Sequence, residues 1–397
     1  MKIFLATVLA LAAAIGIAIY SGNQPTPIPP VPAPLAQEVL DSLPSDRKGQ
    51  VLIYGAYGFT GKGISRLASE YNITPVLSGR NGSKLAPLAE ELGYDSIVLS
   101  LENNHDNLVK VLERFELVMH IAGPYTYTSK PMIDAAIEAG THYVDITGEN
   151  HVIQEQLDRH DEFLAANIMV MPSVGYDVVP TDCLNLYVAQ QVPNATEINL
   201  VMNGNYQAAE GAAASRGTIK SALEMLSRPL LMRQNGEMVL VDQPKMKTRE
   251  VDGKIQTLVQ IPWADMMTSW VSTGIPTIEI YQIAEGELPS WILKLAQYRW
   301  GKNLLVWMID EFMPEGPPPS AQAQRQTQLV TTVTNAAGET ASAEMITPEA
   351  YFLTFHSALN VAQRIINGQW DPGFQTPAKV YGPDLALEVP GVTRRDL

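Results

Sequence analysis

A short apolar run that leads directly into three regularly spaced glycines restricts the fold of this chain more than any other feature. Residues 51–54 have the length and composition of a buried strand, and Gly55, Gly58 and Gly61 follow at intervals of three. Apolar residues at helical spacing come immediately afterwards, over residues 64–71. This order of strand, tight turn and helix predicts the opening of a dinucleotide-binding βαβ unit.

The three glycines have separate expected roles in binding a diphosphate. Gly55 makes the turn, Gly58 lets the backbone approach the diphosphate, and Gly61 lets the helix pack against the strand. Free backbone N–H groups at the start of the helix then bind the negative charge. A glycine-rich turn without a ligand is the alternative that the motif leaves open. The residues of this loop that we expect to contact the cofactor are Gly55, Tyr57, Gly58, Phe59, Thr60 and Gly61.

The end of the second expected strand, residues 74–79, indicates which dinucleotide binds. An acidic residue at this position accepts a hydrogen bond from the free ribose 2′-hydroxyl of NAD, whereas an arginine accommodates the 2′-phosphate of NADP. No Asp or Glu follows the strand, and Arg80 and Asn81 stand there instead. The sequence therefore predicts NADP. A solvated loop cation is the other interpretation of Arg80.

Strand-like and helical segments continue to alternate as far as residue 172. Six strands separated by helices predict an α/β fold with a Rossmann-type, doubly wound parallel sheet. Ligands bind at the carboxyl ends of such strands, so three loops are expected to face one crevice, at residues 122–125, 147–149 and 173–177. The further strands are expected over residues 96–101, 117–125, 142–146 and 168–172, with helices over 104–115, 129–140 and 150–167.

From about residue 186 the pattern changes to strands rich in β-branched residues, with little helix between them. This pattern predicts a second, α+β domain built on a mixed sheet, which covers the nicotinamide and shapes a pocket. A helix over residues 348–366 is expected to return to the first domain. The strands are expected over residues 195–204, 238–241, 256–262, 268–283 and 329–334.

Two segments of the second domain leave alternatives open. Residues 216–218 (Arg-Gly-Thr) precede a helical pattern and suit either a helix cap or a contact near the cofactor. Residues 289–313 have helical spacing and contain three tryptophans, which fits a membrane-interface helix, the lid of a lipid-sized pocket or an inter-domain core helix. Tyr298 and Lys302 reproduce the Tyr-x-x-x-Lys pair of short-chain dehydrogenases, but too late in the chain for that fold.

The N-terminal segment is expected to lie outside the fold. Residues 3–20 carry no charge and no proline, and eighteen such residues are just long enough to cross a bilayer as a helix. No Ala-x-Ala exit site follows, so we expect an uncleaved membrane anchor rather than a signal peptide. Residues 25–34 contain six prolines and predict an extended spacer. Lys2 favours a body outside the cytoplasm, whereas the NADPH pool favours the cytoplasmic face, which we expect.

A chain of 397 residues is too long for one typical core. The expected parts are a membrane anchor or signal segment (1–22), a Pro-rich linker with a short helix (23–47), an NADP-binding Rossmann domain (48–185), a substrate domain (186–345) and a C-terminal helix and tail that return to the first domain (346–397).

Charge, cysteine and histidine content exclude several kinds of partner. The net charge is −15, and a nucleic acid needs a basic surface, so we expect no nucleic-acid partner. The single cysteine, Cys183, excludes an internal disulfide framework and a cysteine-rich metal site. The six histidines show no ligand spacing, so we expect no metal.

Several motifs in order resemble those of the saccharopine dehydrogenase-like oxidoreductases, especially the branch that includes trans-acting enoyl reductases. The resemblance implies an NADP-type cofactor and hydride transfer, with residues 122–125 and 175–177 near the nicotinamide. It adds Ala122, Gly123 and Pro124 to the expected cofactor-binding residues. This sequence departs from the branch at residues 344–351, which replace a glycine-rich turn. The motifs are residues 54–61, 78–81, 122–125, 143–149, 172–182 and 216–218.

Together these features predict a membrane-tethered, NADPH-dependent oxidoreductase of lipid metabolism that reduces an apolar or acyl-chain substrate, such as an enoyl double bond. Tyr125, Tyr176 and Asp177 are candidates for the protonating group, because their loops are expected to face the nicotinamide, although each can instead position its loop. Scattered arginines argue against a substrate with several carboxylates. A non-catalytic NADP-binding assembly protein at the membrane is the alternative. The expected partners are a lipid-like small molecule, a membrane and a second copy of the chain.

Overall fold

The computed structural model describes residues 32–204, 214–226, 228–251, 254–283, 295, 298–318 and 325–397. The expected membrane anchor (1–22) and the first part of the linker lie outside the described residues. Within the described ranges, no helix combines the length and the apolar composition that a membrane crossing requires. A short helix, α2 (Gln37–Asp41), precedes the first strand.

The first domain is built on a seven-stranded sheet with the order β15-β6-β5-β4-β1-β2-β3, in which every neighbouring pair is parallel. The strands are short and buried along their length where helices cover both faces, as β1 and β4 are. The chain order reverses between β1 and β4, and dinucleotides bind at such a switch point. The predicted Rossmann-type sheet is therefore confirmed. Its strands are β1 (Val51–Tyr54), β2 (Val76–Gly79), β3 (Ser96–Val98), β4 (Leu117–His120), β5 (His142–Asp145), β6 (Met169–Met171) and β15 (Gly373–Phe374).

The helices of the first domain differ from the predicted ones in two places. α6 begins at Tyr125 rather than at residue 129, directly after the loop that follows β4. The single helix predicted over residues 150–167 is two helices, because the chain bends at Arg159, whose guanidinium binds Asp134 of α6 at 2.8 Å. The helices are α3 (Phe59–Leu67), η1 (Ala68–Tyr71), α4 (Gly82–Leu92), α5 (His105–Leu112), α6 (Tyr125–Ala139), α7 (Asn150–Asp158), α8 (His160–Ala165) and α9 (Val179–Ala189).

The second domain contains a mixed sheet, as predicted, with the order β10-β11-β12-β7-β13-β14-β16; β8 also pairs with β12, and β9 pairs with β8. The β12–β7 pair is parallel, and the other pairs are antiparallel. Residues along β13 alternate between buried and half-buried, because one face of the sheet packs on α9. The strands are β7 (Ala195–Gly204), β8 (Leu231–Gln234), β9 (Glu237–Leu240), β10 (Met246–Val251), β11 (Lys254–Gln260), β12 (Thr277–Ile283), β13 (Thr327–Asn335), β14 (Thr340–Thr347) and β16 (Thr393–Asp396).

The prediction of one strand over residues 268–283 is wrong. The first part of this segment belongs to helix α11 (Asp265–Thr273), and β12 follows it. Gly274, with a φ of +73°, ends the helix in a left-handed conformation. The second domain also contains α10 (Arg216–Leu226) and α13 (Arg299–Phe312), which lie in the two segments where helical spacing was expected.

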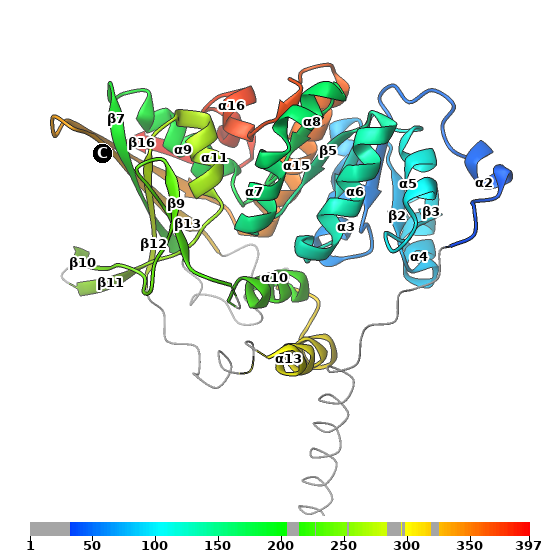
Figure 1. The fold of residues 1–397 in the computed structure, drawn as a ribbon, viewed down its shortest axis with the longest axis horizontal. Coiled ribbons are helices and arrows are strands. Elements are labelled where there is room, and N and C mark those ends of the chain that lie inside the picture. Colours follow the sequence, from blue (N-terminus) through cyan, green and yellow to red (C-terminus); the bar gives the residue numbers. More distant parts are fainter. Residues whose placement is uncertain are drawn as a thin grey trace, which may run out of the picture.

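The C-terminal part of the chain contacts both sheets. Helix α15 (Ala350–Ile366) packs on α3, where the Phe355 ring occupies the space that a side chain on Gly63 would need. The tail after α15 adds β15 to the first sheet and β16 to the second, with α16 (Pro377–Tyr381) and η3 (Leu385–Glu388) between them. Figure 1 shows α10 between the two sheets, below α7 and α3, and α13 below α10.

Candidate functional site

A cavity of about 820 Å³ lies at the carboxyl ends of β1, β2 and β4, on the side that α10 covers. Both domains therefore contribute to its walls. The first domain supplies Tyr54, Gly55, Tyr57, Gly58, Phe59, Thr60, Lys62, Gly79, Arg80, Lys84, Ser100, Leu101, Glu102, Ile121, Ala122, Gly123, Pro124, Tyr127 and Thr128, and the second supplies Ser215, Arg216, Gly217, Lys220, Asp310 and Glu315.

The glycine loop forms the end of the cavity next to α3. Gly55 has a φ of +87°, and a Cβ at this residue would lie 2.7 Å from the carbonyl oxygen of Ile121. A Cβ on Gly61 would overlap the Gly55 carbonyl oxygen, so α3 can start this close to the turn only with glycine there. Gly58 precedes α3 without a side-chain cap, which leaves the first N–H groups of the helix for an anion. This geometry fits a dinucleotide diphosphate.

Two cations at the end of β2 fit a phosphate on the ribose. Arg80 and Lys84 line the cavity, and neither forms an ion pair in the part of the chain that the structure describes. Lys62, in the same cavity, differs because it binds Glu315 at 2.9 Å. An anionic group that enters this end therefore meets two cations that form no ion pair with a described carboxylate, although Glu315 attracts Lys84 at longer range.

Two residues predicted to contact the cofactor have other contacts in the structure. The Asn81 side chain caps α4, since its Oδ1 accepts a hydrogen bond from the Lys84 N–H at 3.3 Å. Gly61 packs against the turn behind the loop. Neither belongs to the cavity lining, whereas the other nine predicted cofactor-binding residues do.

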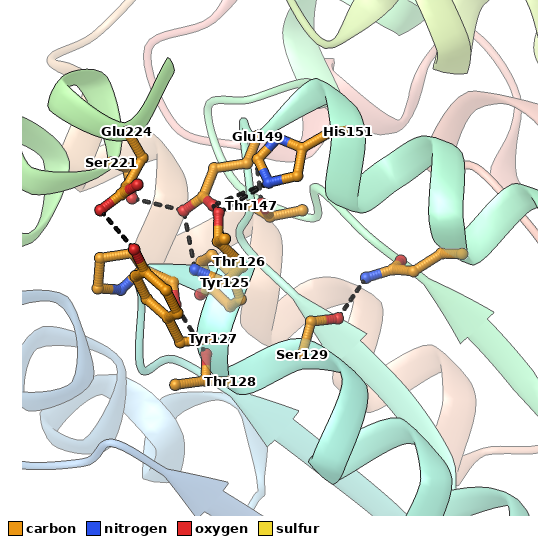
Figure 2. Close-up of polar contacts among 12 residues, drawn as sticks. Tyr125, Thr126, Tyr127, Thr128, Ser129, Thr147, Glu149, His151, Ser221 and Glu224 are labelled. Carbon is orange, nitrogen blue, oxygen red and sulfur yellow. Dashed lines mark hydrogen bonds and ion pairs between the residues drawn. The ribbon is translucent and has the colours of Figure 1, made fainter. Parts of the chain in front are cut away.

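Glu149 is a fully buried carboxylate that binds the first turn of α6 (Figure 2). Its Oε1 accepts a hydrogen bond from the Tyr125 N–H at 2.8 Å, and its Oε2 accepts from the N–H and the hydroxyl of Thr126 at 2.8 and 2.6 Å. The positive end of the helix dipole stabilises a carboxylate at this position. The Ser221 hydroxyl of α10 donates to Oε1 at 2.7 Å. One side chain thus joins the loop after β5, the start of α6 and the second domain.

The sequence analysis assigned no role to Glu149. Its local signal, an acidic residue next to the start of a helix, suggests a cap for α7, which begins at Asn150. Its side chain instead caps α6, which begins 24 residues before Glu149 in the chain. Only the side-by-side arrangement of β4 and β5 brings the two segments together.

Other residues of the motif around Glu149 form a buried network that holds the strand ends. Asp145 accepts hydrogen bonds from the Tyr143 hydroxyl at 2.8 Å and from the N–H groups of Thr147 and Ser173 at 2.9 and 3.1 Å. Burial raises the pKa of Asp145, although these hydrogen bonds oppose the shift. Burial also lowers the pKa of His120 to about 3, so its imidazole is neutral. The His120 Nδ1 lies 3.0 Å from the Tyr143 hydroxyl oxygen. These groups position loops at the cavity edge.

The three residues predicted as proton donors are not among those that line the cavity. The Tyr125 side chain is buried, and its hydroxyl donates to the His120 carbonyl oxygen at 3.0 Å. Tyr176 is also buried, and its N–H donates to the Thr354 hydroxyl. The Asp177 Oδ1 is shielded from solvent, receives no hydrogen bond from a described residue, and burial raises the pKa of this carboxyl to about 7. Their catalytic role stays a prediction.

The second domain contributes the start of α10 and the segment after α13. Both interpretations of residues 216–218 have a basis in the structure. The Ser215 hydroxyl caps α10, since it accepts a hydrogen bond from the Thr218 N–H at 3.2 Å, and Arg216 and Gly217 line the cavity. The Arg216 Nε donates to the Met313 carbonyl oxygen at 2.7 Å, which ties α10 to the end of α13.

One face of helix α13 packs on α10 of the same domain, so its described apolar contacts are not those of an inter-domain core helix. Leu305 and Ile309 pack with Leu223 of α10 in a small cluster of their own. Trp307 and Phe312 are 52% and 69% exposed, so the other face remains open to solvent. Trp291, which belonged to the predicted helix, lies outside the described residues.

Comparison with known proteins supports this assignment of the cavity. Residues 51–171 match the family model of the saccharopine dehydrogenase NADP binding domain. The chain is 28% identical over 202 residues to a saccharopine dehydrogenase-like oxidoreductase of Rattus norvegicus, covering 45% of this chain and 46% of that protein. It is 31% identical over 151 residues to a trans-acting enoyl reductase of Mycobacterium leprae, covering 36% of each. The match thus spans less than half the length of these curated relatives.

A solved structure shares the fold over most of the chain. Apo saccharopine dehydrogenase (L-Glu forming) from Saccharomyces cerevisiae superposes with a TM-score of 0.58 at 14% identity, covering 88% of this chain and 99% of that one. The family model confirms the resemblance and the NADP cofactor predicted from the glycine loop and Arg80. The family model therefore indicates an NADP-binding domain, and the solved structure shares the fold of the chain.

Proposed function

We propose that this chain, which carries an NADP-binding domain of the saccharopine dehydrogenase type, uses NADPH to reduce an apolar acyl-chain substrate, such as an enoyl double bond. The observation that carries the proposal is the single cavity that joins the glycine loop, Arg80 and Lys84 to the start of α10. One wall of this cavity fits the cofactor, and the second domain covers the place where a substrate would meet it.

The residues of the chain have distinct parts in this reaction. NADPH, when bound, supplies a hydride. The first turn of α3 binds the diphosphate, and Arg80 with Lys84 binds the 2′-phosphate. Residues 122–124 line the cavity between this site and α10, and they orient the nicotinamide in the manner that the family resemblance implies. Glu149 holds the helix that follows this loop.

The arginines of the second domain support an apolar substrate over one with several carboxylates. Of those whose side chains the structure describes, only Arg216 lines the cavity. Arg233 is buried elsewhere, where its guanidinium lies 4.2 Å from the centre of the Trp270 ring. A substrate with several carboxylates needs a cluster of guanidinium groups at the cavity. The trans-acting enoyl reductase among the relatives supports the enoyl group.

The test starts with the cofactor. Full-length protein is titrated with NADPH and NADH by fluorescence, for the wild type, for Arg80→Ala and for a control, Arg66→Ala, whose guanidinium binds Glu91 on the outer side of α3. Arg80→Ala should weaken NADPH binding by about 10- to 100-fold and leave NADH binding unchanged, because only NADPH carries the 2′-phosphate. Equal loss for both cofactors, or no loss, would contradict the role of Arg80.

The second step tests the reaction. Oxidation of NADPH is followed at 340 nm with a trans-2-dodecenoyl thioester as the probe. Turnover of the probe supports the reductase. NADPH binding without turnover of this or any other acyl probe would favour the alternative function, a non-catalytic NADP-binding assembly protein.

We also propose that the protein is tethered to the cytoplasmic face of a membrane. The apolar residues 3–20 and the exposed Trp307, Met308 and Phe312 of α13 support this location. Membrane fractionation of the full chain and of a variant that lacks residues 1–22 tests it, and a full chain in the soluble fraction would overturn it. The homodimer stays a prediction, which light scattering of the detergent-solubilised protein tests.

A further inference from the structure

Tyr127 differs from the three predicted proton donors because it lines the cavity. It lies in the first turn of α6, where its N–H donates to the Pro124 carbonyl oxygen at 3.2 Å. It therefore follows directly after residues 122–124, the loop that the family resemblance places near the nicotinamide. The residue is 58% exposed, so part of it is open to a molecule in the cavity.

Two charged side chains from the second domain contact the Tyr127 hydroxyl. The hydroxyl donates to the Glu224 Oε1 of α10 at 3.0 Å (Figure 2), and the Lys302 Nζ of α13 donates to the hydroxyl oxygen at 3.3 Å. Lys302 also binds the Glu224 Oε2 at 2.7 Å. Burial lowers the pKa of Lys302, but the hydrogen bonds to Glu224 and Tyr127 outweigh it, so the pKa is raised and the ammonium stays charged.

This arrangement suits a proton donor, Tyr127, that has a second protonated group, Lys302, beside it. An ammonium within hydrogen-bond distance stabilises the negative charge that a phenol acquires when it gives up its proton, and Lys302 also offsets the charge of Glu224, which by itself would oppose a phenolate. The Glu224 and Lys302 side chains are 8% and 21% exposed, so the charge interactions are less screened than on an open surface. Tyr127 itself is part of the cavity wall, where a donor has to be.

We propose that Tyr127 is the proton donor of the reduction and that Lys302 restores its proton; the proposal rests on the function proposed above. The hydride adds to the β-carbon of the enoyl group, and the double-bond electrons move to form an enolate. The Tyr127 O–H bond breaks, and its proton bonds to the α-carbon. Lys302 then gives a proton to the phenolate and is reprotonated by water. NADPH is oxidised to NADP⁺, and the alkene is reduced by one hydride and one proton.

The chain offers a matched control for this role. Tyr298 is also 58% exposed and stands four residues before Lys302, but it stacks on Trp300 at 6.2 Å and is absent from the cavity lining. Tyr127→Phe and Tyr298→Phe each remove one hydroxyl and keep the ring. Lys302→Met removes the ammonium, and Lys302→Arg keeps a cation.

The experiment uses full-length protein, NADPH and the trans-2-dodecenoyl thioester, and it measures kcat, KM, the NADPH Kd and the unfolding temperature. Tyr127→Phe should lower kcat by about 10²- to 10⁴-fold with the Kd unchanged, whereas Tyr298→Phe should leave all four values unchanged. Lys302→Met should lower kcat, and Lys302→Arg should restore part of it. A structure with NADP⁺ bound gives a second readout, in which the Tyr127 hydroxyl should lie within roughly 6 Å of the nicotinamide C4.

Each other outcome has a definite meaning. Wild-type kcat in Tyr127→Phe, or a hydroxyl far from the nicotinamide, overturns the proposal and leaves the reductase function intact. A Tyr127→Phe variant with weaker NADPH binding and a lower unfolding temperature but an unchanged kcat also overturns it. Tyr127 would then only stabilise the contact between the two domains. A wild type that binds NADPH and reduces no acyl probe overturns the proposed function, and the role of Tyr127 fails with it.

Discussion

The two walls of the cavity are built in different ways. The first-domain wall is backbone packed into the main core: β1 is buried along its length, and Gly61 has no room for a side chain. The second-domain wall, α10 and α13, has a small core of Leu223, Leu305 and Ile309. The contacts described above that join it to the first domain are hydrogen bonds and ion pairs, from Ser221, Glu224, Lys302 and Glu315.

This difference separates the tasks of the two walls. Close packing tolerates little change in volume, so the packed wall keeps a fixed shape for a cofactor of constant shape. Polar contacts near the surface are individually weaker, so the other wall can change its side chains without disturbing the main core. In agreement with this, the family model matches residues 51–171, which lie in the first domain.

The largest effect is expected from a substitution that breaks the packed wall. A Cβ on Gly61 overlaps backbone, which cannot move aside, so Gly61→Ala should lower the free energy of unfolding by about 3 kcal/mol. NADPH binding should weaken by more than about tenfold because the displaced turn no longer fits the diphosphate. Urea unfolding and NADPH titration measure the two effects.

The matched control stands on the other wall. A Cβ on Gly217 of α10 would lie 3.7 Å from its nearest neighbour, an ordinary contact. Gly217→Ala should therefore stabilise the helix by at most about 1 kcal/mol. Equal destabilisation by the two substitutions would remove the distinction between the walls.

The next effect tests Glu149, a buried carboxylate that joins the two walls. Glu149→Gln removes the negative charge at the start of α6 and turns an NH₂ group toward donors, so it should destabilise the protein by about 2 kcal/mol. Ser221→Ala removes only the contact with α10 and should cost about 1 kcal/mol. Urea unfolding of both variants checks the order, and a larger effect for Ser221→Ala would contradict it.

A smaller effect is expected at Asp177, which lies between β6 and α9 and is not part of the cavity lining. Burial raises the pKa of Asp177 to about 7 in the folded state, whereas the unfolded value is about 3.9. The unfolded state therefore loses its proton first, and stability falls as the pH rises from about 4 to about 7. Asp177→Asn should remove this fall and gain about 1–2 kcal/mol at pH 8, reduced by partial exposure.

Unfolding free energies at pH 4.5 and pH 8 for the wild type and Asp177→Asn measure this gain. An unchanged pH dependence would mean that the Asp177 carboxyl titrates normally. The same variant also tests the predicted catalytic role of Asp177, because a loss of turnover without any change in this pH dependence would support a proton donor.

The smallest effect is expected at an exposed ion pair between the walls. The Lys62 and Glu315 side chains are 31% and 62% exposed, and such pairs contribute less than about 1 kcal/mol. Glu315→Gln should therefore change the free energy of unfolding by less than about 0.5 kcal/mol at physiological salt. A loss above about 2 kcal/mol would show that the second wall is held more firmly than its contacts indicate.

The fold of the first domain could be predicted because its signals are local. Strand β1, the turn at Gly55 and the start of α3 lie within a dozen residues, and each follows from the residues next to it. The second domain was less predictable. Trp270 and Val271 favour a strand by composition, yet they lie in α11, which is helical because one face packs against α9.

The residues of the candidate site also fall into those that local sequence predicts and those that it does not. The sequence by itself determined the glycine loop and the position of Arg80, because the shape of a tight turn and the charge after a strand depend on neighbouring residues. Only the tertiary structure decided that Glu149 caps α6 and that Lys302 reaches Tyr127, which stands 175 residues earlier in the chain. The contacts of these side chains depend on how the two domains pack, and packing joins residues that no local pattern relates.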